Sequence, residues 1–373
     1  MSKEQQFDYQ VYGAKVSSLE IESLLNHLFE SFPDRKDSVP VPLCIWGMHG
    51  IGKTQLIKEY AKKNGYHFGY IAPAQFEEMG DLVGMPKITT KECGSTETSI
   101  VPPSWVPQQE GPGIFLIDDV NRADDRILRG IMQLLQDYEL VSWKLPSKWM
   151  IVLTANPDGG DYSVTSMDDA MLTRMMHVTL EFDVKSWAKW AEFSNVDPRG
   201  IAFVLAYPEI VTGGRTTPRS LVQFFCSIKR IRDLKDNLTI VKILADGCLD
   251  PQTAISFINF VSMDLAKLVT PEEILEASKF EPIRNRIEDL VEGKVKRLDI
   301  LSVILTRLTN YLVSSKAELT DKQFENLKKF IQLPTIPNDL RLAMAQEIVK
   351  SEKKSAKRLY AVPEVGKLLL TKM

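Results

Sequence analysis

The 373-residue sequence lacks any run of 18 or more apolar residues, so no segment is expected to cross a membrane. Residues Met1 to Gln6 lack the apolar stretch of a signal peptide, which favours a cytoplasmic location. A large excess of positive charge is also missing, since the net charge is −3. This disfavours a nucleic-acid motor without excluding one, because a ring can line its pore with local basic charge.

Cysteine is scarce, and its spacing fits neither a redox motif nor a zinc site. Cys44, Cys93, Cys226 and Cys248 are scattered and form no C-x-x-C pair, which favours reduced, mostly structural thiols. A hydrophobic content of 44% and a charged content of 25% are typical of a globular protein. The length exceeds that of one typical core and predicts one large and one smaller domain.

A glycine-rich segment carries the strongest chemical signal. Residues 47–54 read G-x-x-x-x-G-K-[ST] and lie between an apolar run, Val41 to Trp46, and a helical pattern, Gln55 to Lys62. This order predicts a phosphate site in which backbone N–H groups and a helix dipole face a nucleotide. Lys53 would reach the phosphates of the nucleotide and Thr54 would bind Mg²⁺, unless the segment is only a turn. The candidate nucleotide-binding residues are Gly47, His49, Gly50, Ile51, Gly52, Lys53, Thr54 and Gln55.

The pattern of apolar residues predicts an α/β fold followed by helices. Five short apolar segments alternate with helical ones, which favours a parallel five-stranded sheet with helices on both faces. From about Phe182 onward, apolar residues recur mostly every three or four positions, which predicts a helical lid and a helical tail. The expected domains are 1–181, 182–320 and 321–373. The predicted strands are Val41–Trp46, Tyr66–Ile71, Ile114–Ile117, Met150–Thr154 and Met176–Leu180, and the predicted helices include 17–30, 186–193, 198–207, 218–231, 241–245, 253–265, 271–278, 283–290, 298–312, 322–331 and 339–349.

Polar residues follow two of the predicted strands. Asp118 would hold Mg²⁺ at the carboxyl end of the third strand, and Asp119 would orient or deprotonate water. Alternatively, both acids cap a helix that starts near Ala123, although Asp124 could do that alone. Asn156, after the fourth strand, would hydrogen-bond the water or the γ-phosphate, unless it only forms an Asn-Pro turn.

Together these segments resemble the AAA+ ATPases, and specifically the MoxR-like clade related to chelatase and dynein-type modules. The resemblance covers about residues 13 to 225 and implies a P-loop NTPase fold. Five segments carry it: Gly47 to Thr54 as Walker A, Ile114 to Ala123 as Walker B, Thr154 to Pro157 as sensor 1, Met171 to Met175 with an arginine finger, and Gly213 to Leu221 with sensor 2.

The resemblance implies roles for two arginines. Arg174 would reach into the site of a neighbouring subunit, and Arg219 would contact the γ-phosphate from the lid of its own subunit. Without the resemblance, an isolated arginine is usually a surface charge or part of an ion pair. Other candidates for contacts across the subunit boundary are Arg122, Arg126, Arg129 and Arg215.

A finger lent by a neighbour requires a head-to-tail ring, which closes most simply as a hexamer. Members of this clade commonly act on a partner with a von Willebrand factor A-like domain, so chaperone-like remodelling of a protein client is expected. The alternatives are a nucleic-acid motor and an assembly module that binds ATP with little hydrolysis. The family usually has Glu where this chain has Asp119, and a shift of about 1 Å in a catalytic group can lower the rate about 10²-fold. ATP binding is therefore the firmer expectation, and turnover the weaker one.

Three further segments are set apart by length or charge. Residues 73–112 form a long connection between the second and third strands, either a substrate-facing insertion or an outer loop. Residues 138–149 predict a β-hairpin, with Trp143 as a contact point or a core residue and Trp149 in the core. The basic stretch Lys350 to Arg358 is interpreted as a solvated helix face or linker.

Overall fold

The structure, a computed structural model, describes residues 11–31, 40–90, 94–157, 164–211, 214–263, 268–291, 297–314, 318–350, 358–363 and 365–366. Interpretations of Met1 to Gln6, Cys93, Gly213 and residues 351–357 lie outside the described residues. The chain divides into two compact units, Met1–Phe182 and Asp183–Met373. The division into three domains stays a prediction. Within the described ranges, no helix is both long and apolar enough to cross a bilayer.

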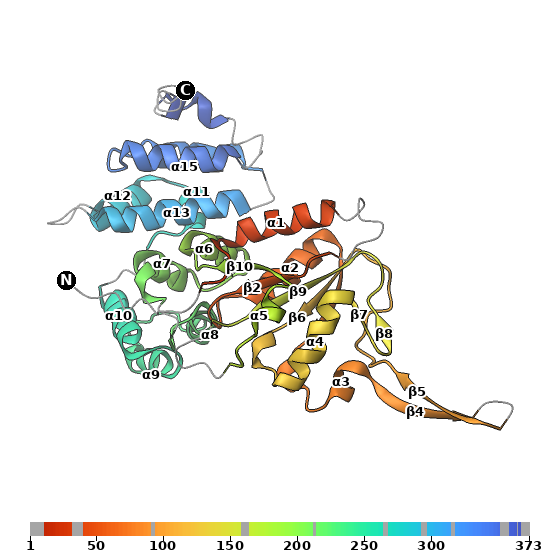
Figure 1. The fold of residues 1–373 in the computed structure, drawn as a ribbon. Coiled ribbons are helices and arrows are strands. Elements are labelled where there is room, and N and C mark those ends of the chain that lie inside the picture. The colour runs from red at the N-terminus through yellow and green to blue at the C-terminus, as the bar shows by residue number, and fades with distance from the viewer. Residues whose placement is uncertain are drawn as a thin grey trace. The chain divides into compact units, whose positions relative to one another are not determined.

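A six-stranded parallel sheet forms the centre of the first unit (Figure 1). The α/β prediction is confirmed, and all five predicted strands are present. The expected number of strands was one too few, because Ala14–Val16 pairs with the edge of the sheet as a three-residue strand. In spatial order the strands are β1 (Ala14–Val16), β10 (Met176–Leu180), β2 (Leu43–Trp46), β9 (Trp149–Ala155), β6 (Gly113–Ile117) and β3 (His67–Ile71).

Position in the sheet decides which strands are buried. Every residue of β2, β6 and β9 is buried, as expected for central parallel strands covered on both faces. The segment Tyr66–Ile71 was expected to be a buried strand, and this was wrong. It forms β3 at the edge of the sheet, where Tyr70 is 45% exposed.

Helices cover both faces of this sheet (Figure 1). On one face, α1 (Ser18–Glu30) and α2 (Lys53–Asn64) pack through residues such as Ile21 and Ile57. On the other, α4 (Asp125–Asp137) and α5 (Asp169–Leu172) pack through residues such as Ile127. Asp124 caps α4, because its carboxylate accepts from the N–H groups of Arg126 and Ile127. Capping of α4 by Asp118 or Asp119 is therefore wrong.

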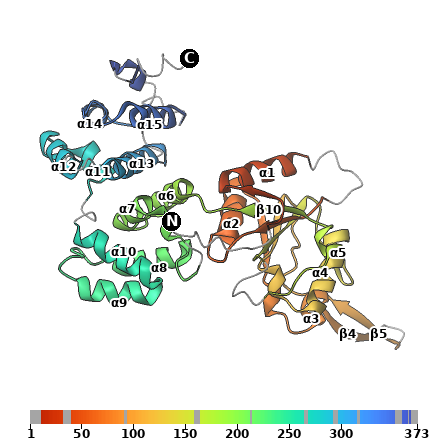
Figure 2. The same cartoon turned by 60° about the vertical axis from the view of Figure 1, so that its left-hand side comes forward.

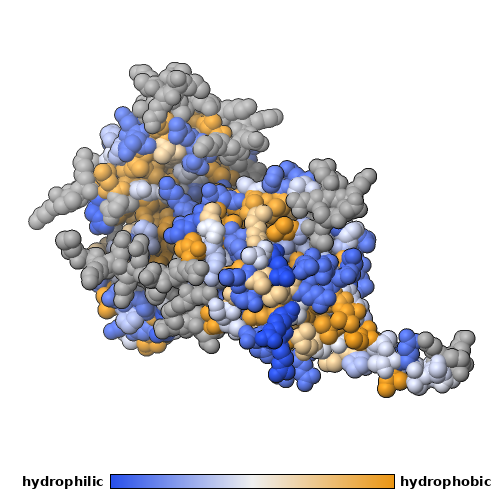
Figure 3. All heavy atoms as spheres, viewed as in Figure 1, coloured by the Kyte–Doolittle hydropathy of each residue, from blue (hydrophilic) through white to orange (hydrophobic). Residues whose placement is uncertain are grey.

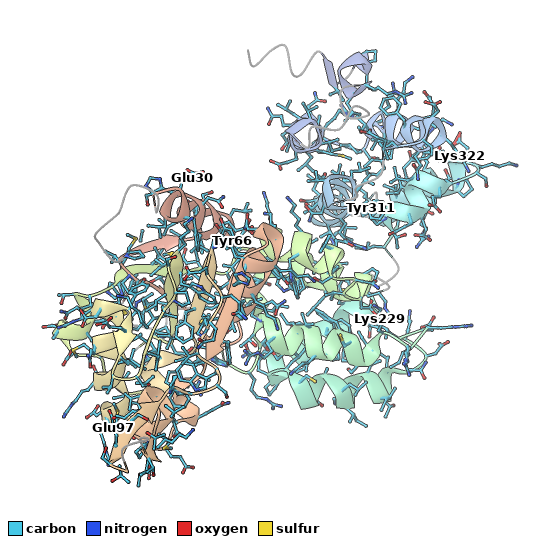
Figure 4. All side chains as sticks on the ribbon, turned by 90° about the vertical axis from the view of Figure 1, so that its right-hand side faces the viewer. Glu30, Tyr66, Glu97, Lys229, Tyr311 and Lys322 are labelled. Carbon is cyan, nitrogen blue, oxygen red and sulfur yellow. The ribbon has the colours of Figure 1, made fainter. Side chains whose placement is uncertain are left out.

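Residues 73–112 include α3 (Met79–Val83) and an antiparallel pair, β4 (Met85–Thr90) and β5 (Thr96–Val101). Every residue of both strands is exposed, and the pair projects from the first unit as an arm (Figures 1 and 2). Glu97 marks this arm in Figure 4. Figure 3 shows hydrophobic side chains on it, and Ile88 is 72% exposed. Contact of the arm with a substrate stays a prediction.

The hairpin expected in residues 138–149 is present as β7 (Glu139–Leu140) and β8 (Trp143–Lys144), and Trp143 and Trp149 are both buried. It holds the root of the arm, because Trp143 Nε1 donates to Leu82 O at 3.0 Å and Ser142 Oγ donates to Val83 O. The arm is therefore fixed at its base by hydrogen bonds to a neighbouring hairpin.

The second unit is helical, as predicted, and its tail helices pack on its other helices (Figure 2). In α14, Asn326 Nδ2 donates to Leu275 O and Ala277 O, both at 2.9 Å. Lys322 of the same helix donates to Glu276 O at 3.1 Å, and both Lys322 and Tyr311 are labelled in Figure 4. The helices are α6 (Val184–Phe193), α7 (Pro198–Ala206), α8 (Pro218–Ile228), α9 (Leu238–Cys248), α10 (Pro251–Ser262), α11 (Pro271–Glu276), α12 (Glu281–Val291), α13 (Leu298–Ser314), α14 (Asp321–Ile331) and α15 (Asn338–Lys350).

Candidate functional site

The glycine loop connects β2 to α2 through a tight bend. Gly47, Gly50 and Gly52 have φ values of 154°, 71° and 103°, a region that residues with a Cβ rarely adopt. The loop ends at the N-terminus of α2, a helix of 12 residues. Its backbone N–H groups and dipole favour an anion at that point. Glycine at these positions therefore lets the chain wrap around the start of a helix, as a phosphate cradle requires.

Lys53 is the first residue of α2, and its side chain turns back toward the loop. It is 5% exposed. Its Nζ donates to Gly47 O at 2.5 Å, to Met48 O at 3.2 Å and to Asn156 Oδ1 at 3.1 Å. The ammonium group is thus held between the loop and the end of β9, which places a positive charge beside the cradle.

Asp118 lies at the end of β6 and accepts hydrogen bonds from three hydroxyl groups. Thr54 and Thr154 each donate to Oδ1 at 2.7 Å, and the Tyr70 hydroxyl donates to Oδ2 at 3.2 Å. Strand β9 separates β6 from β2, so Asp118 reaches the glycine loop through Thr54 and not through a neighbouring strand. Burial, and then the nearby charge of Asp118, raise the pKa of Tyr70, so the phenol stays neutral and able to donate.

Thr54 and Asp118 suit a magnesium ion that is completed by phosphates. Mg²⁺ usually takes one or two protein oxygens and fills its octahedron with substrate phosphates and water. In the described part of the chain, no group of three or more His, Cys, Asp or Glu side chains could hold a metal by itself. The adjacent Thr54 and Asp118 oxygens therefore fit an Mg²⁺ ion whose other positions are filled by phosphates and water.

Asp119 adopts the left-handed conformation, with φ 48° and ψ 48°. Its N–H donates to Thr154 Oγ1 at 2.8 Å, and its Oδ1 accepts from Asn156 Nδ2 at 3.1 Å. Its Oδ2 lies 3.6 Å from Arg122 Nε. Asn156 therefore bridges Lys53 and Asp119, so the lysine, the amide and the second acid form one connected network.

Asn121 holds Asn156 in place, a role that the sequence did not indicate. It is fully buried. Its Nδ2 donates to Asn156 O at 2.8 Å, and its Oδ1 accepts from Asn156 N at 3.1 Å. The signal available in the sequence was an amide within Ile114 to Ala123, where a buried polar side chain needs partners. Thr154 and Tyr70 were likewise not predicted to bind Asp118.

Two further predicted residues, Arg174 and Gln55, form hydrogen bonds with residues outside this network. Arg174 donates to Ala170 O, and its Nε and Nη2 lie 3.4 Å and 3.3 Å from Gln136 Oε1. Within the described ranges, no hydrogen bond or ion pair links it to Asp118 or Asp119. Gln55 donates to Glu59 Oε1 at 2.7 Å on the exposed side of α2, and His49 and Ile51 are half-buried in the loop.

Arg219 is exposed in the first turn of α8, in the second unit. Among the other arginines, Arg126 and Arg129 are exposed on α4. Arg215 donates to the carbonyls of Asp246, at 3.3 Å, and Gly247, at 2.8 Å, near the end of α9. The contact of Arg219 with the γ-phosphate of its own subunit stays a prediction. Contacts across a subunit boundary by the other candidates also stay predictions, and these candidates are Arg122, Arg126, Arg129 and Arg215.

Comparisons with known proteins match the segment that contains the network. Residues 42–175 match the family model of the AAA domain, dynein-related subfamily. No curated protein matches the chain. The Holliday junction branch migration motor RuvB of Thermotoga maritima is similar at 15% identity over 84% of this chain and 95% of that chain, with a TM-score of 0.38. A putative ATPase from Cytophaga hutchinsonii is similar at 14% identity over 80% and 82%, with a TM-score of 0.32.

Similarities at these TM-scores carry no information about function, whereas the family match covers the site itself. The matched residues contain the glycine loop, Asp118, Asp119, Asn156 and Arg174, and they exclude Arg219. In residues 42–175, therefore, this chain has an AAA domain of the dynein-related subfamily.

Proposed function

We propose that the chain is an Mg-ATP-binding and hydrolysing AAA+ ATPase of the MoxR-like type. It assembles head to tail into a ring, most simply a hexamer, and remodels a protein client. A partner with a von Willebrand factor A-like domain is the first client to test. The observation that carries the proposal is the connected network of Lys53, Asn156 and Asp119 beside the pair of Thr54 and Asp118.

In this proposal, Lys53 would bind the β- and γ-phosphates of ATP, and Thr54 and Asp118 would hold an Mg²⁺ ion. That ion would neutralise charge on the phosphates. Asp119 would accept a proton from the water whose oxygen bonds to the γ-phosphorus, while the bond from that phosphorus to the β-phosphate oxygen breaks and ADP leaves. Asn156 would keep Asp119 and the water aligned through its amide group. Arg219 would contact the γ-phosphate, a role that the resemblance alone suggests.

Replacing Lys53 tests the nucleotide site. Lys53→Ala removes the buried charge at the loop and should abolish ATP binding, lowering affinity about 10²-fold or more, since several charge-assisted bonds are lost together. Lys58→Ala, an exposed position on the same helix, is the matched control and should bind as the wild type does. Fluorescence titration with a labelled ATP analogue measures both. Tight binding by Lys53→Ala would show that the glycine loop is assigned wrongly.

Replacing Arg174 tests assembly across a boundary between copies. In the described part of the chain, its guanidinium bonds to Gln136 and Ala170 and to neither Asp118 nor Asp119. This leaves it available to a neighbouring copy in the proposed ring. Arg174→Ala should bind ATP normally and lose turnover by about 10³-fold or more. Mixing it with Asp118→Ala subunits should restore turnover, because each variant supplies what the other lacks. The rate of phosphate release measures the turnover of each variant and of the mixture. A mixture that is as inactive as the two separate variants would contradict assembly into a ring with a shared arginine.

A further inference from the structure

The His177 side chain connects two elements of the proposed site that are far apart in sequence. Trp46 Nε1 lies 3.0 Å from His177 Nδ1, and His177 Nε2 lies 2.8 Å from Leu172 O. Trp46 is the last residue of β2 and directly precedes Gly47. Leu172 is the last residue of α5, two positions before Arg174. A single imidazole thus joins the strand entering the glycine loop to the turn that carries the arginine.

The two neighbours of the ring determine where its hydrogen lies. An indole N–H can only donate, and a backbone carbonyl can only accept. His177 Nδ1 must therefore be without a hydrogen, and Nε2 must carry one. Trp46 is 1% exposed, so a ring that lost its acceptor would leave the indole N–H buried without a partner. Only the neutral imidazole with its hydrogen on Nε2 can bond to both the Trp46 N–H and the Leu172 carbonyl.

Both ends of this connection are held firmly. The Trp46 ring stacks on Tyr12 with centroids 4.1 Å apart, and Tyr12 O accepts from Thr179 Oγ1 at 2.8 Å. At the other end, Leu172 O also accepts from Met175 N at 3.2 Å. Both groups that bond to the imidazole are therefore themselves held by further contacts.

We propose that His177 is a positioning residue that sets Arg174 relative to the glycine loop of its own chain. This inference rests on the proposed function, because it assigns His177 to the arginine that one copy lends to the next. Both ring nitrogens bond to protein groups, Nδ1 to Trp46 and Nε2 to Leu172, so its effect passes through Leu172 and the α5 turn. It makes the finger of each copy responsive to the state of that copy's own glycine loop.

Three variants separate the two hydrogen bonds. His177→Asn keeps an acceptor near the position of Nδ1 and loses the donor to Leu172. His177→Gln keeps a polar group near the position of Nε2 and loses the acceptor for Trp46. Trp46→Phe removes the indole N–H and keeps a ring beside Tyr12. Each should lower turnover about 10- to 100-fold, as expected for a small misplacement of a catalytic group.

Nucleotide affinity distinguishes positioning from damage to the loop. The three variants should bind the labelled ATP analogue within about twofold of the wild type, so the loss is in kcat alone. His27→Asn, at an exposed histidine on α1, is the matched control and should change neither quantity. Affinity that falls in step with turnover would overturn the proposal, as would wild-type turnover in all three variants.

Mixed assemblies give a result that a merely structural role would not. Asp119→Asn subunits lack the proposed proton acceptor but keep Lys53 and the glycine loop, so they should bind ATP and retain a normally placed Arg174. Mixed with His177→Asn subunits, they lend the finger to intact nucleotide sites, so turnover should recover. A mixture that stays inactive overturns the proposal.

If the wild type binds ATP but does not hydrolyse it, amide hydrogen exchange of residues 168–175 tests the proposal instead. Mg-ATP should change exchange there in the wild type and not in His177→Asn, and an equal change in both overturns the proposal. A wild type that binds no ATP refutes the proposed function and this inference together.

Discussion

Asp119 shows how one residue's conformation shapes the candidate site. Its left-handed backbone, with φ 48°, is a conformation that Asp and Asn adopt more readily than other residues with a Cβ. The short side chain then reaches Asn156 Nδ2 on one side and Arg122 on the other. An aspartate at a position where the family usually has glutamate is thus compatible with this backbone, although it is one methylene shorter.

Thr154 gives a test at the residue scale. It is fully buried, donates to Asp118 and accepts from the N–H of Asp119. Thr154→Val keeps the shape but leaves that N–H without a partner, which should lower the free energy of unfolding by about 1–3 kcal/mol. It should also lower ATP turnover, because both acids lose a fixed contact. Urea unfolding and phosphate release measure the two effects.

Thr309→Val is the matched control for this substitution. Thr309 is a buried threonine of α13 whose hydroxyl donates to Leu305 O at 2.8 Å. The control should lose stability by about 1 kcal/mol, the usual net value of one hydrogen bond, and should keep its turnover. If Thr154→Val and Thr309→Val both retain full turnover, Thr154 does not hold Asp118 and Asp119 in a catalytically useful position.

The site residues that were predicted and those that were missed differ in how they are encoded. Lys53, Thr54 and Asp118 belong to local patterns, so their spacing along the chain was sufficient. Thr154 lies beside Asp118 because the register of β6 and β9 pairs Ile117 with Leu153. The spacing of residues along the chain does not predict such pairing between strands that are distant in sequence. Tyr70 reaches Asp118 for the same reason, through the pairing of Ile71 with Ile117.

At the scale of elements, helices and central strands were predictable, and short or exposed strands were not. The predicted helix 322–331 appears as α14, Asp321–Ile331, because a buried stripe repeats at helical spacing. Strand β1 has three residues, none of them fully buried, so it leaves no apolar run. The strands of the arm are exposed throughout and lack the one-sided alternation that marks a half-buried strand.

The N-terminus of α10 gives a pH test at this scale. The Asp250 carboxylate caps the helix by accepting from Thr253 N at 3.0 Å, and it also accepts from the Thr216 hydroxyl. Burial acts to raise the pKa of Asp250, but the hydrogen bonds from Thr216 and Thr253 outweigh it and hold the pKa below the ordinary 3.8. The folded state then binds fewer protons than the unfolded state just below pH 3.8, so this contribution is lost as the pH falls.

Asp250→Asn isolates that contribution, because asparagine also caps helices well but carries no charge. The stability advantage of the wild type over Asp250→Asn should be largest above about pH 5 and should shrink toward about pH 3. Denaturant unfolding of both proteins across this range measures it. A constant difference between the two proteins would contradict the assignment of the charge to this cap.

At the scale of the whole molecule, the chain comprises an α/β unit and a helical unit, and the proposed ligand gives a test of the first. A ligand that binds only the folded state stabilises it by about 2.7 kcal/mol at one hundred times its Kd. Mg-ATP should therefore raise the unfolding temperature of the wild type. Removing Mg²⁺ with EDTA should reverse most of the shift, because Thr54 and Asp118 then have no cation to hold.

Calorimetry of the wild type and Lys53→Ala measures this shift. The variant should show no change with Mg-ATP. An equal shift in both proteins would indicate binding elsewhere on the chain. An unchanged shift after chelation would indicate that nucleotide binds here without metal.

The anchored root of the β4–β5 arm has a mechanical consequence. Six residues per strand extend about 20 Å at the usual rise of a β-strand. The root bonds to Ser142 and Trp143, between the end of α4 and β9, the strand that leads to Asn156. A tilt of about 10° at that root would sweep the tip through roughly 3 Å over such a length. The arm would thus act as a lever, turning a slight rearrangement near the acids into a larger displacement far from them.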